Sequence, residues 1–394
     1  MLMAQHFGCA RHVYNWALDK KVRHYKQTGK SLSKRALQDA LVASKKADKP
    51  WLKEVNSQML LASLGHLDAA FTNFFQGRAR FPCFKKKYAG WQSFQCPQHV
   101  KVSFESSSIQ LPKIGSVSSR LHREFEGKVK TVTIKRSPSG KYFASILVDD
   151  GAESPIPATV EADKTKGIDL GLTDYLIDDR GEKTTNPKHL KHGLERLAIE
   201  QKKLARKQTG SANRAKQKYL VARIHEQISN KRSDFIHQIT AKLAYKSHET
   251  SFAVEDLNVK GMLRNRKLAR AISDSGWGLF LRALTYKCDW SGKNVLRIGR
   301  FEPSSKLCSE CGFKAQKMPL SIRHWQCPDC GANHDRDTNA ARNIKQFALA
   351  DALGWSVCVK SSPASIPFCD GGAAKDSDSA LDGSQEAPTK TLRV

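Results

Sequence analysis

The stretch Gly167-Ile-Asp-Leu-Gly-Leu172 places one acidic residue, Asp169, inside an otherwise apolar segment. The mostly apolar residues 166–177 around it predict one buried strand, and Asp178-Asp-Arg-Gly181 predicts the turn that ends it. An unpaired carboxylate in a buried strand costs several kcal/mol. Asp169 therefore needs a metal ion or a cationic side chain beside it.

Further acidic residues follow along the chain. Residues 251–255 predict a second buried strand, which ends in Glu255 and Asp256, while Asp335 and Asp337 stand at the start of a predicted helix. Because strands at 251–255 and 294–298 alternate with helices, we expect an α/β domain. Carboxylates at the ends of neighbouring strands can hold Mg²⁺, and two such ions can clamp an in-line phosphoryl displacement. Taken singly, an Asp at a helix start is more often an N-cap, and Glu-Asp after a strand is more often a turn.

Four of the ten cysteines form two pairs, Cys308–Cys311 and Cys327–Cys330, with fifteen residues between the pairs. This spacing is typical of a zinc ribbon, in which four thiolates surround a structural Zn²⁺. A glycine follows each pair, at the point where the knuckle has to turn sharply. The alternatives are a redox dithiol or a chance spacing. The length of the chain argues against a disulfide framework.

A long helical region begins at Pro187, and its charge is one-sided. Between Lys188 and Arg232 there are thirteen Lys plus Arg and three Glu, a local net charge of +10. Such a run is often only a solvated helix face, but its single sign favours a nucleic-acid groove. The residues that we expect to contact nucleic acid here are Lys202, Lys203, Arg206, Arg214 and Arg232.

The first 80 residues predict an α-helical domain, which ends in a basic and aromatic loop. In residues 78–87 five cations alternate with Phe81 and Phe84, so the loop could follow a phosphate backbone while its rings stack on bases. A solvated basic loop is the alternative. The cations that we expect to bind are Arg78, Arg80, Lys85, Lys86 and Lys87.

The period of the pattern then changes to two. Residues 100–104, 129–134 and 142–148 predict strands of a small antiparallel β-unit, with a turn at 137–140. Residues 151–163 contain two prolines and predict a linker. The tail from Ser361 carries three cations and five anions among small residues, and we expect it to be disordered.

The composition agrees with a nucleic-acid partner. The 394 residues include 66 Lys plus Arg and 38 Asp plus Glu, which gives a formal net charge of +28. No stretch approaches 18 uncharged apolar residues, and the N-terminus lacks a secretory signal pattern. We therefore expect a cytoplasmic protein that does not bind a membrane.

These motifs occur in a fixed order, and in that order the chain resembles the transposon-encoded TnpB (OrfB) family. The resemblance covers nearly all of residues 7–347. The segments that carry it are Phe7-Gly-Cys-Ala-Arg-His-Val-Tyr-Asn-Trp-Ala-Leu18, Phe81-Pro-Cys-Phe-Lys-Lys-Lys87, Leu111-Pro-Lys-Ile-Gly115, Gly167-Ile-Asp-Leu-Gly-Leu172, Phe252-Ala-Val-Glu-Asp-Leu-Asn-Val259, Ser304-Ser-Lys-Leu-Cys-Ser-Glu-Cys-Gly312 and Asp335-Arg-Asp-Thr-Asn-Ala-Ala-Arg-Asn-Ile344.

The resemblance implies an RNA-guided DNA endonuclease that uses two Mg²⁺ ions and a guide RNA from the transposon end. Its implied partners are the target DNA and, as a further candidate, the partner transposase of the same element. It implies that Asp169, Glu255 and Asp337 are the catalytic, magnesium-binding acids, with Asp335 in a supporting position. Arg336 would order the helix start or contact a phosphate, and Asn339 matches the same motif.

The resemblance also implies a multidomain α/β fold with an RNase H-like (RuvC) nuclease domain and an inserted zinc ribbon. On this basis we expect a helical recognition lobe at 1–95 and a β wedge-like unit at 96–160. The nuclease domain would span 161–300 and, after the ribbon at 301–334, continue over 335–358. A disordered tail would occupy 359–394.

One departure concerns the start of the chain. Family members begin with a strand before the first helix, whereas this sequence starts almost at Phe7. Loss of an edge strand could unsettle the β-unit. A second functional hypothesis is therefore a guide-RNA or DNA binder that tempers transposition without cleavage. A third is a transposase that joins strands itself, but the sequence lacks the His-x-His and Tyr residues of the partner transposases.

Overall fold

The computed structural model describes residues 2–87, 90–300, 302–319, 321–355, 357, 359 and 391–393. The chain divides into two compact units. The first comprises residues 1–153, 218–223 and 387–394, and the second comprises 154–217 and 224–386. Within the described ranges, no helix has the length and apolar character that a membrane crossing requires.

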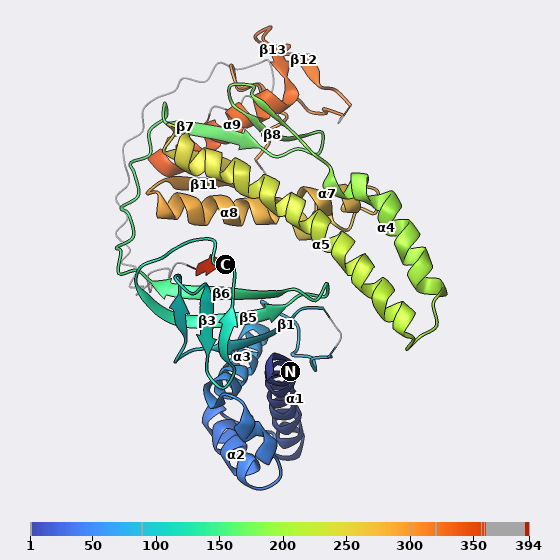
Figure 1. Cartoon of the computed structure of the whole chain (residues 1–394). Helices are drawn as coiled ribbons and strands as arrows, with labels where there is room; N and C mark the ends of the chain where they lie inside the picture. The colour runs from blue at the N-terminus through green and yellow to red at the C-terminus, as the bar shows by residue number, and fades with distance from the viewer. Residues whose placement is uncertain are drawn as a thin grey trace. The chain divides into compact units, whose positions relative to one another are not determined.

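The first unit begins with the helices that the sequence predicts. They are α1 (Leu2–Thr28), α2 (Lys34–Lys46), the 3₁₀ turn η1 (Pro50–Glu54) and α3 (Ser57–Phe75), drawn in blue in Figure 1. Ser33 and Asn56 cap α2 and α3 through their side-chain oxygens. The core between the helices is aliphatic and contains Leu18, Met59, Leu60, Leu64 and Leu67, each at most 1 % exposed.

Two small antiparallel sheets follow. One has the strand order β1 (Gln92–Cys96), β5 (Lys128–Arg136), β6 (Tyr142–Asp149) and β14 (Thr391–Arg393), and the other contains β2 (Lys101–Ser103), β3 (Ser108–Leu111) and β4 (Gly115–Ser118). The predicted strands at 100–104, 129–134 and 142–148 and the turn at 137–140 are confirmed. The sequence analysis missed β1, β3 and β4. Residues 360–390 of the tail that we predicted to be disordered lie outside the described residues.

The second unit is built on a five-stranded mixed sheet. Its order is β11 (Asn294–Ile298), β10 (Ser251–Glu255), β7 (Thr165–Asp169), β8 (Asp174–Asp178) and β9 (Lys183–Thr185). β7, β10 and β11 are parallel, while β8 is antiparallel to both of its neighbours. The predicted strands at 251–255 and 294–298 are confirmed. The single strand predicted over 166–177 is wrong, because Gly171 lies in a tight turn that divides the segment into β7 and β8.

Helices cover both faces of this sheet. Ile168, Phe252 and Val254 pack with α5 (Ala212–Ala241) and α8 (Trp277–Trp290) in one core. On the other face Ala253 and Ile298 pack against α9 (Arg336–Leu353). The long helical region predicted after Pro187 is confirmed, and it consists of two helices, α4 (His189–Arg206) and α5, because the chain turns at 207–211 and Ser211 caps the second helix. A short π-helical turn (Lys242–Lys246) ends α5, and α6 (Val259–Met262) and α7 (Ala269–Ser275) precede α8.

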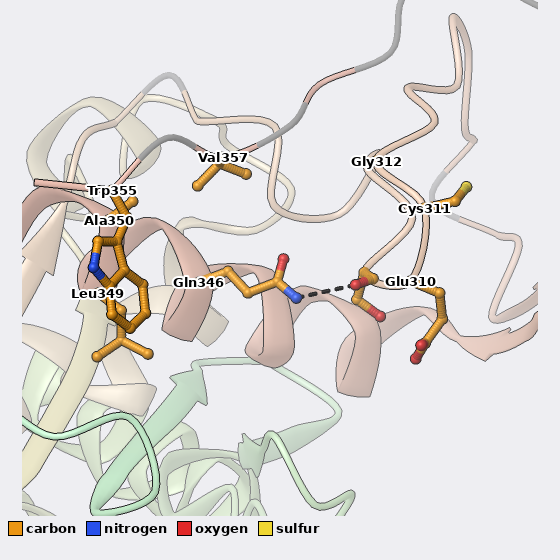
Figure 2. A pocket seen from close by; sticks show the side chains of 9 residues that line it. Glu310, Cys311, Gly312, Gln346, Leu349, Ala350, Trp355 and Val357 are labelled. Atoms are coloured by element: carbon orange, nitrogen blue, oxygen red, sulfur yellow. Dashed lines mark hydrogen bonds between the residues drawn. The ribbon is translucent and has the colours of Figure 1, made fainter. Parts of the chain in front are cut away.

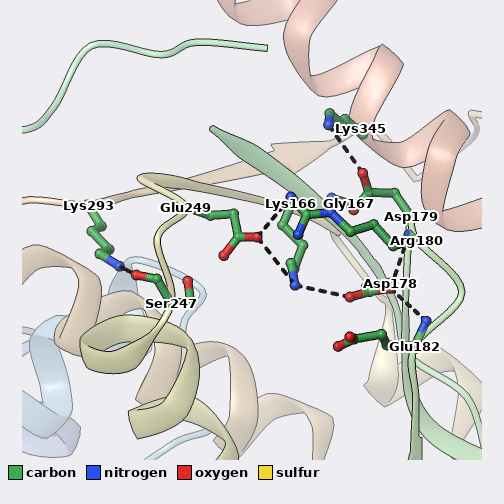
Figure 3. Close-up of polar contacts among 10 residues, drawn as sticks. All are labelled: Lys166, Gly167, Asp178, Asp179, Arg180, Glu182, Ser247, Glu249, Lys293 and Lys345. Atoms are coloured by element: carbon green, nitrogen blue, oxygen red, sulfur yellow. Dashed lines mark hydrogen bonds and ion pairs between the residues drawn. The ribbon is translucent and has the colours of Figure 1, made fainter. Parts of the chain in front are cut away.

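An ion network joins the strands at the edge of the sheet opposite the ends of β7 and β10 (Figure 3). Lys166 donates to Asp178 at 3.0 Å and lies 3.5 Å from Glu249, which also pairs with Arg180 at 3.2 Å. Asp178 and Glu249 are both buried, so neither charge would be tolerated without these partners. The network fixes the start of β7 against the segment that leads into β10.

Candidate carboxylate site and cysteine cluster

Asp169 and Glu255 are the last residues of two neighbouring parallel strands. β7 and β10 pair in register from Thr165 with Ser251 to Ile168 with Val254, so the next residues, Asp169 and Glu255, lie side by side at one edge of the sheet. α9 packs against β7, β10 and β11 and begins at Arg336, which places Asp337 in its first turn. The topology therefore brings together the three acids that the sequence analysis singled out.

The electrostatics of Asp169 show that the other two acids lie near it. Burial raises the pKa of Asp169, and the neighbouring carboxylates of Glu255 and Asp337 raise it further, to about 7. The backbone N–H of Leu170 and the guanidinium of Arg336 oppose this shift only in part. An acid held in this way lacks a compensating positive charge, and a divalent cation would supply one. Carboxylates are the donor type that Mg²⁺ prefers, but the oxygens of these three acids do not all lie within 4.8 Å of one another, so a shared ion would have to draw them together.

Asp335, at the start of α9, has a different role from Asp337. Asp335 is the N-cap and accepts hydrogen bonds from the backbone N–H groups of Asp337 at 3.1 Å and Thr338 at 3.0 Å. It also pairs with Lys183 of β9 at 2.8 Å. Burial opposes ionisation of Asp335, but the bonds from Lys183 and Thr338 lower its pKa to about 2. Asp335 thus has the capping role that was left open in the sequence analysis.

Glu255 and Asp337 also have polar partners among the described residues. Arg323 contacts both carboxylate oxygens of Asp337, at 3.1 and 3.2 Å. The hydroxyl of Ser304 donates to Oε1 of Glu255 at 2.6 Å. The sequence analysis did not identify Arg323, Ser304 or Lys183 as site residues. Ser304 does belong to the motif that precedes the first cysteine pair, and this was the one available signal.

The four paired cysteines converge in space. Their sulfur atoms all lie within 4.8 Å of one another, and no other such group occurs in the part of the chain that the structure describes. Cys308 and Cys330 are 3.7 Å apart and Cys311 and Cys327 are 3.6 Å apart, close to the edge of about 3.8 Å expected for a tetrahedron with Zn–S bonds of about 2.3 Å. The donor set fits Zn²⁺, and the spacing does not fit a disulfide.

Backbone geometry shapes both knuckles as predicted. Gly312 and Gly331 have positive φ angles of 76° and 74°, which favour glycine, and their N–H groups bond to the carbonyls of Cys308 and Cys327. The hairpin of β12 (His324–Gln326) and β13 (Asn333–Asp335) completes the ribbon. His334 of this hairpin is buried, and its Nε2 lies 3.0 Å from the sulfur of Cys308. This contact supports the thiolate from outside the cysteine set.

A cavity of about 290 Å³ lies between the first knuckle and the end of α9 (Figure 2). Gln346 crosses it and donates to the carbonyl of Ser309 at 3.0 Å, and Trp355 forms one wall. Cys311 of the cysteine cluster lines the cavity, and none of the three acids does.

The predicted basic loop is anchored at two points. Phe81 packs edge-on against Phe71 and Phe74 of α3, although its side chain stays 47 % exposed. Asn15 binds both backbone polar groups of Lys85, whose ammonium lies 4.1 Å from the ring centre of Tyr14. The remaining predicted loop contacts are exposed: Phe84, Arg78, Arg80, Lys86 and Lys87.

Three of the predicted nucleic-acid contacts make internal bonds instead. Arg214 donates to the carbonyls of residues 204 and 207 and so caps the end of α4. Arg232 pairs with Asp274 at 2.8 Å. Arg336 is 7 % exposed and donates to the carbonyl of Pro319, which corresponds to the ordering role considered for it. Lys202, Lys203 and Arg206 are exposed on α4, and Lys203 also pairs with Glu200.

Comparison with known proteins gives consistent results. Residues 145–266 match the family described as "Probable transposase", residues 277–344 match "Cas12f1-like, TNB domain", and residues 1–30 match a "Helix-turn-helix domain". A Streptomyces pristinaespiralis protein named "Putative RNA-guided DNA endonuclease" is 40 % identical over 360 residues, 90 % of this chain and 87 % of its own. The Escherichia coli K12 protein "Putative RNA-guided DNA endonuclease InsQ" is 33 % identical and covers 87 % of each chain.

The fold has a counterpart among solved structures. The protein chain in a cryo-EM structure of a Cas12f1–sgRNA–target DNA complex aligns with a TM-score of 0.52 over 87 % of this chain and 82 % of that one, at 13 % identity. This likeness concerns the fold alone. It confirms the predicted α/β multidomain fold.

Proposed function

Because the chain belongs to the transposon-encoded OrfB (TnpB) family, we propose that it is an RNA-guided DNA endonuclease of a mobile element. The observation that supports the proposal is that Asp169 and Glu255 end two paired parallel strands, with Asp337 near enough to raise the pKa of Asp169. A carboxylate with a pKa raised to about 7 beside two other acids is typical of a catalytic metal site and unusual for a purely structural one.

In this proposal the three acids hold two Mg²⁺ ions. When bound, such ions activate a water molecule for attack on the phosphodiester and stabilise the leaving oxygen. Asp169 and Glu255 supply oxygens from the fixed ends of two paired strands, and Asp337 supplies them from the first turn of α9. Arg323 has to release Asp337 for a metal to bind there, and it is then free to contact a phosphate.

The proposed partners are a guide RNA from the transposon end and the DNA that it pairs with, and the partner transposase of the same element is a further candidate. Base pairing would select the target, while the protein would recognise the backbone of the heteroduplex and a short adjacent motif. The cations that we keep as candidate contacts are exposed: Arg78, Arg80, Lys86 and Lys87 in the loop, and Lys202, Lys203 and Arg206 on α4. Zn²⁺ in the cysteine cluster would hold the ribbon beside the acids.

The test is cleavage by the protein purified with co-expressed transposon-end RNA. We expect Mg²⁺-dependent cleavage of a plasmid library that carries the guide's target beside a randomised motif, and none with Asp169→Ala or Glu255→Ala. Asp256→Ala is the matched control, because Asp256 adjoins Glu255 but pairs with Arg300 at 2.6 Å. This variant should cleave like the wild type.

The same experiment addresses the second function, binding without cleavage. If the wild-type protein retains the RNA but cuts no member of the library, and Asp169→Ala behaves identically, the nuclease proposal is wrong. The binding function would then explain the retained RNA.

A further inference from the structure

The segment that leads into the zinc ribbon contacts the second acid directly. Ser304 is 7 % exposed, and its hydroxyl donates to Oε1 of Glu255 at 2.6 Å. Its own backbone N–H bonds to the carbonyl of Glu302 at 2.8 Å, so the hydroxyl is presented from a tight turn. The bond from the Ser304 hydroxyl fixes Oε1 of Glu255, which leaves Oε2 to face a cation.

Two asparagines of α9 hold this segment in place. Asn343 is fully buried, and its amide donates to the carbonyls of Ser304 and Leu307, both at 2.7 Å. One helical turn earlier, Asn339 donates to the carbonyl of Leu307 at 2.7 Å and accepts from the N–H of Ser309 at 3.0 Å. A buried side-chain amide that makes several hydrogen bonds is costly to disturb, because removing one partner leaves buried polar groups unpaired.

These hydrogen bonds connect α9, the first cysteine knuckle and Glu255. α9 carries Asp337 and, through Asn339 and Asn343, binds residues 304–309. The same six residues contain Cys308 of the cysteine cluster and Ser304 at Glu255. A displacement of the first knuckle would therefore move the hydroxyl that orients Glu255.

We propose that Ser304 is a positioning residue that orients the Glu255 carboxylate for a divalent cation, and that Asn343 couples it to the first cysteine knuckle. This inference rests on the proposed nuclease function. Partners that orient a metal ligand typically change metal affinity or activity 10- to 100-fold when they are removed. Ser304 touches neither the cation nor the substrate in this proposal, so its effect is exerted through Glu255.

The test compares Ser304→Ala with Ser304→Thr, which keeps the hydroxyl, and with Ser305→Ala as the matched neighbour. Binding of Ca²⁺, as a probe that does not require cleavage, is measured by calorimetry on the RNA-bound protein, together with the Mg²⁺ midpoint of cleavage. We expect Ser304→Ala to weaken Ca²⁺ binding and raise the Mg²⁺ midpoint by about 10-fold. Ser304→Thr should keep Ca²⁺ affinity and the Mg²⁺ midpoint close to their wild-type values, and Ser305→Ala should change neither quantity.

A structural role alone would give a different result. Zinc content, measured by mass spectrometry, and melting temperature should be the same in Ser304→Ala and the wild type. In a Glu255→Gln background the Ser304→Ala effect on Ca²⁺ binding should vanish, because both changes act on the same carboxylate. Unchanged Ca²⁺ binding in Ser304→Ala, or a loss that persists without Glu255, overturns the inference. If Ser304→Ala weakens Ca²⁺ binding only while Glu255 is present but the wild type cuts no DNA, the proposed function fails and the positioning role stands.

Discussion

At the scale of single residues, the fold disfavours the ionised form of Asp169. Its folded-state pKa is raised from 3.8 to about 7, chiefly by burial. Above pH 7 the carboxylate is ionised in both the folded and the unfolded states, and the unfavourable charge destabilises the fold by up to about 4 kcal/mol. Below about pH 4 it is protonated in both states, and this destabilisation disappears.

We therefore expect Asp169→Asn to raise the melting temperature of the protein in magnesium-free buffer at pH 8 and to leave it nearly unchanged at pH 4. Calorimetric melts across this pH range measure the difference. Asp256→Asn, which removes a charge paired with Arg300, should not show this rise. An equal or lower melting temperature for Asp169→Asn at pH 8 would mean that a cation of the protein already compensates Asp169.

The candidate acids were predictable, but their partners were not. Asp169 and Glu255 end apolar strands, and the carboxyl ends of parallel strands meet at one edge, so their proximity follows from a local pattern. Arg323 and Ser304 contact their acids across 14 and 49 residues of sequence, through loops without periodicity. No spacing rule indicates such contacts, because they depend on how the ribbon folds back onto α9.

At the scale of elements, the approach of α9 to β7 determines whether the acids can meet. A Cβ atom at Gly167 would lie 2.0 Å from the backbone oxygen of Ala341 and 2.9 Å from Cβ of Lys345. Neither neighbour is the flexible end of a side chain, so the helix itself would have to move. Overpacking of this kind typically destabilises a protein by about 1–3 kcal/mol.

We expect Gly167→Ala to lower the melting temperature and to reduce Mg²⁺-dependent cleavage strongly, because Asp337 moves with α9. The control is Gly278→Ala on α8, where a Cβ meets no atom within 4 Å and alanine favours the helix. Its melting temperature should equal or exceed that of the wild type. Full cleavage by a folded Gly167→Ala protein would show that the acids tolerate a shift of α9.

The wrong single strand over 166–177 and the unpredicted break inside the helical region have a common physical cause. Both the β7–β8 turn and the break between α4 and α5 lie within segments whose periodic pattern continues on either side. At the first, Gly171 approaches the carbonyl of Asp174 so closely that a Cβ would lie 2.6 Å from it. At the second, the cap formed by Ser211 and the bonds from Arg214 end one helix and begin the next. Side-chain capping and close backbone approach override hydrophobic periodicity at such points.

At the scale of the whole molecule, the net charge of +28 is distributed unevenly, and +10 of it lies between residues 188 and 232. Within that segment Arg214 and Arg232 make internal bonds, so fewer cations are available to contact phosphate than the local charge suggests. The exposed cations that remain on α4 include Lys202, Lys203 and Arg206. These three allow the electrostatic part of RNA binding to be tested locally.

Each phosphate that a cation neutralises adds about 0.7–0.9 to the slope of log affinity against log salt. Replacing Lys202, Lys203 and Arg206 with alanine should therefore lower the magnitude of this slope by about 2 and weaken guide-RNA binding most at low salt, as measured by filter binding from 50 to 300 mM salt. The charge-matched control replaces Lys26, Lys30 and Lys46, which are exposed on or beside α1 and α2. That control removes the same net charge but no proposed contact, so its slope should stay near that of the wild type. Equal losses of slope in the two triple variants would show that α4 contributes only to the overall field of the protein and makes no direct phosphate contact.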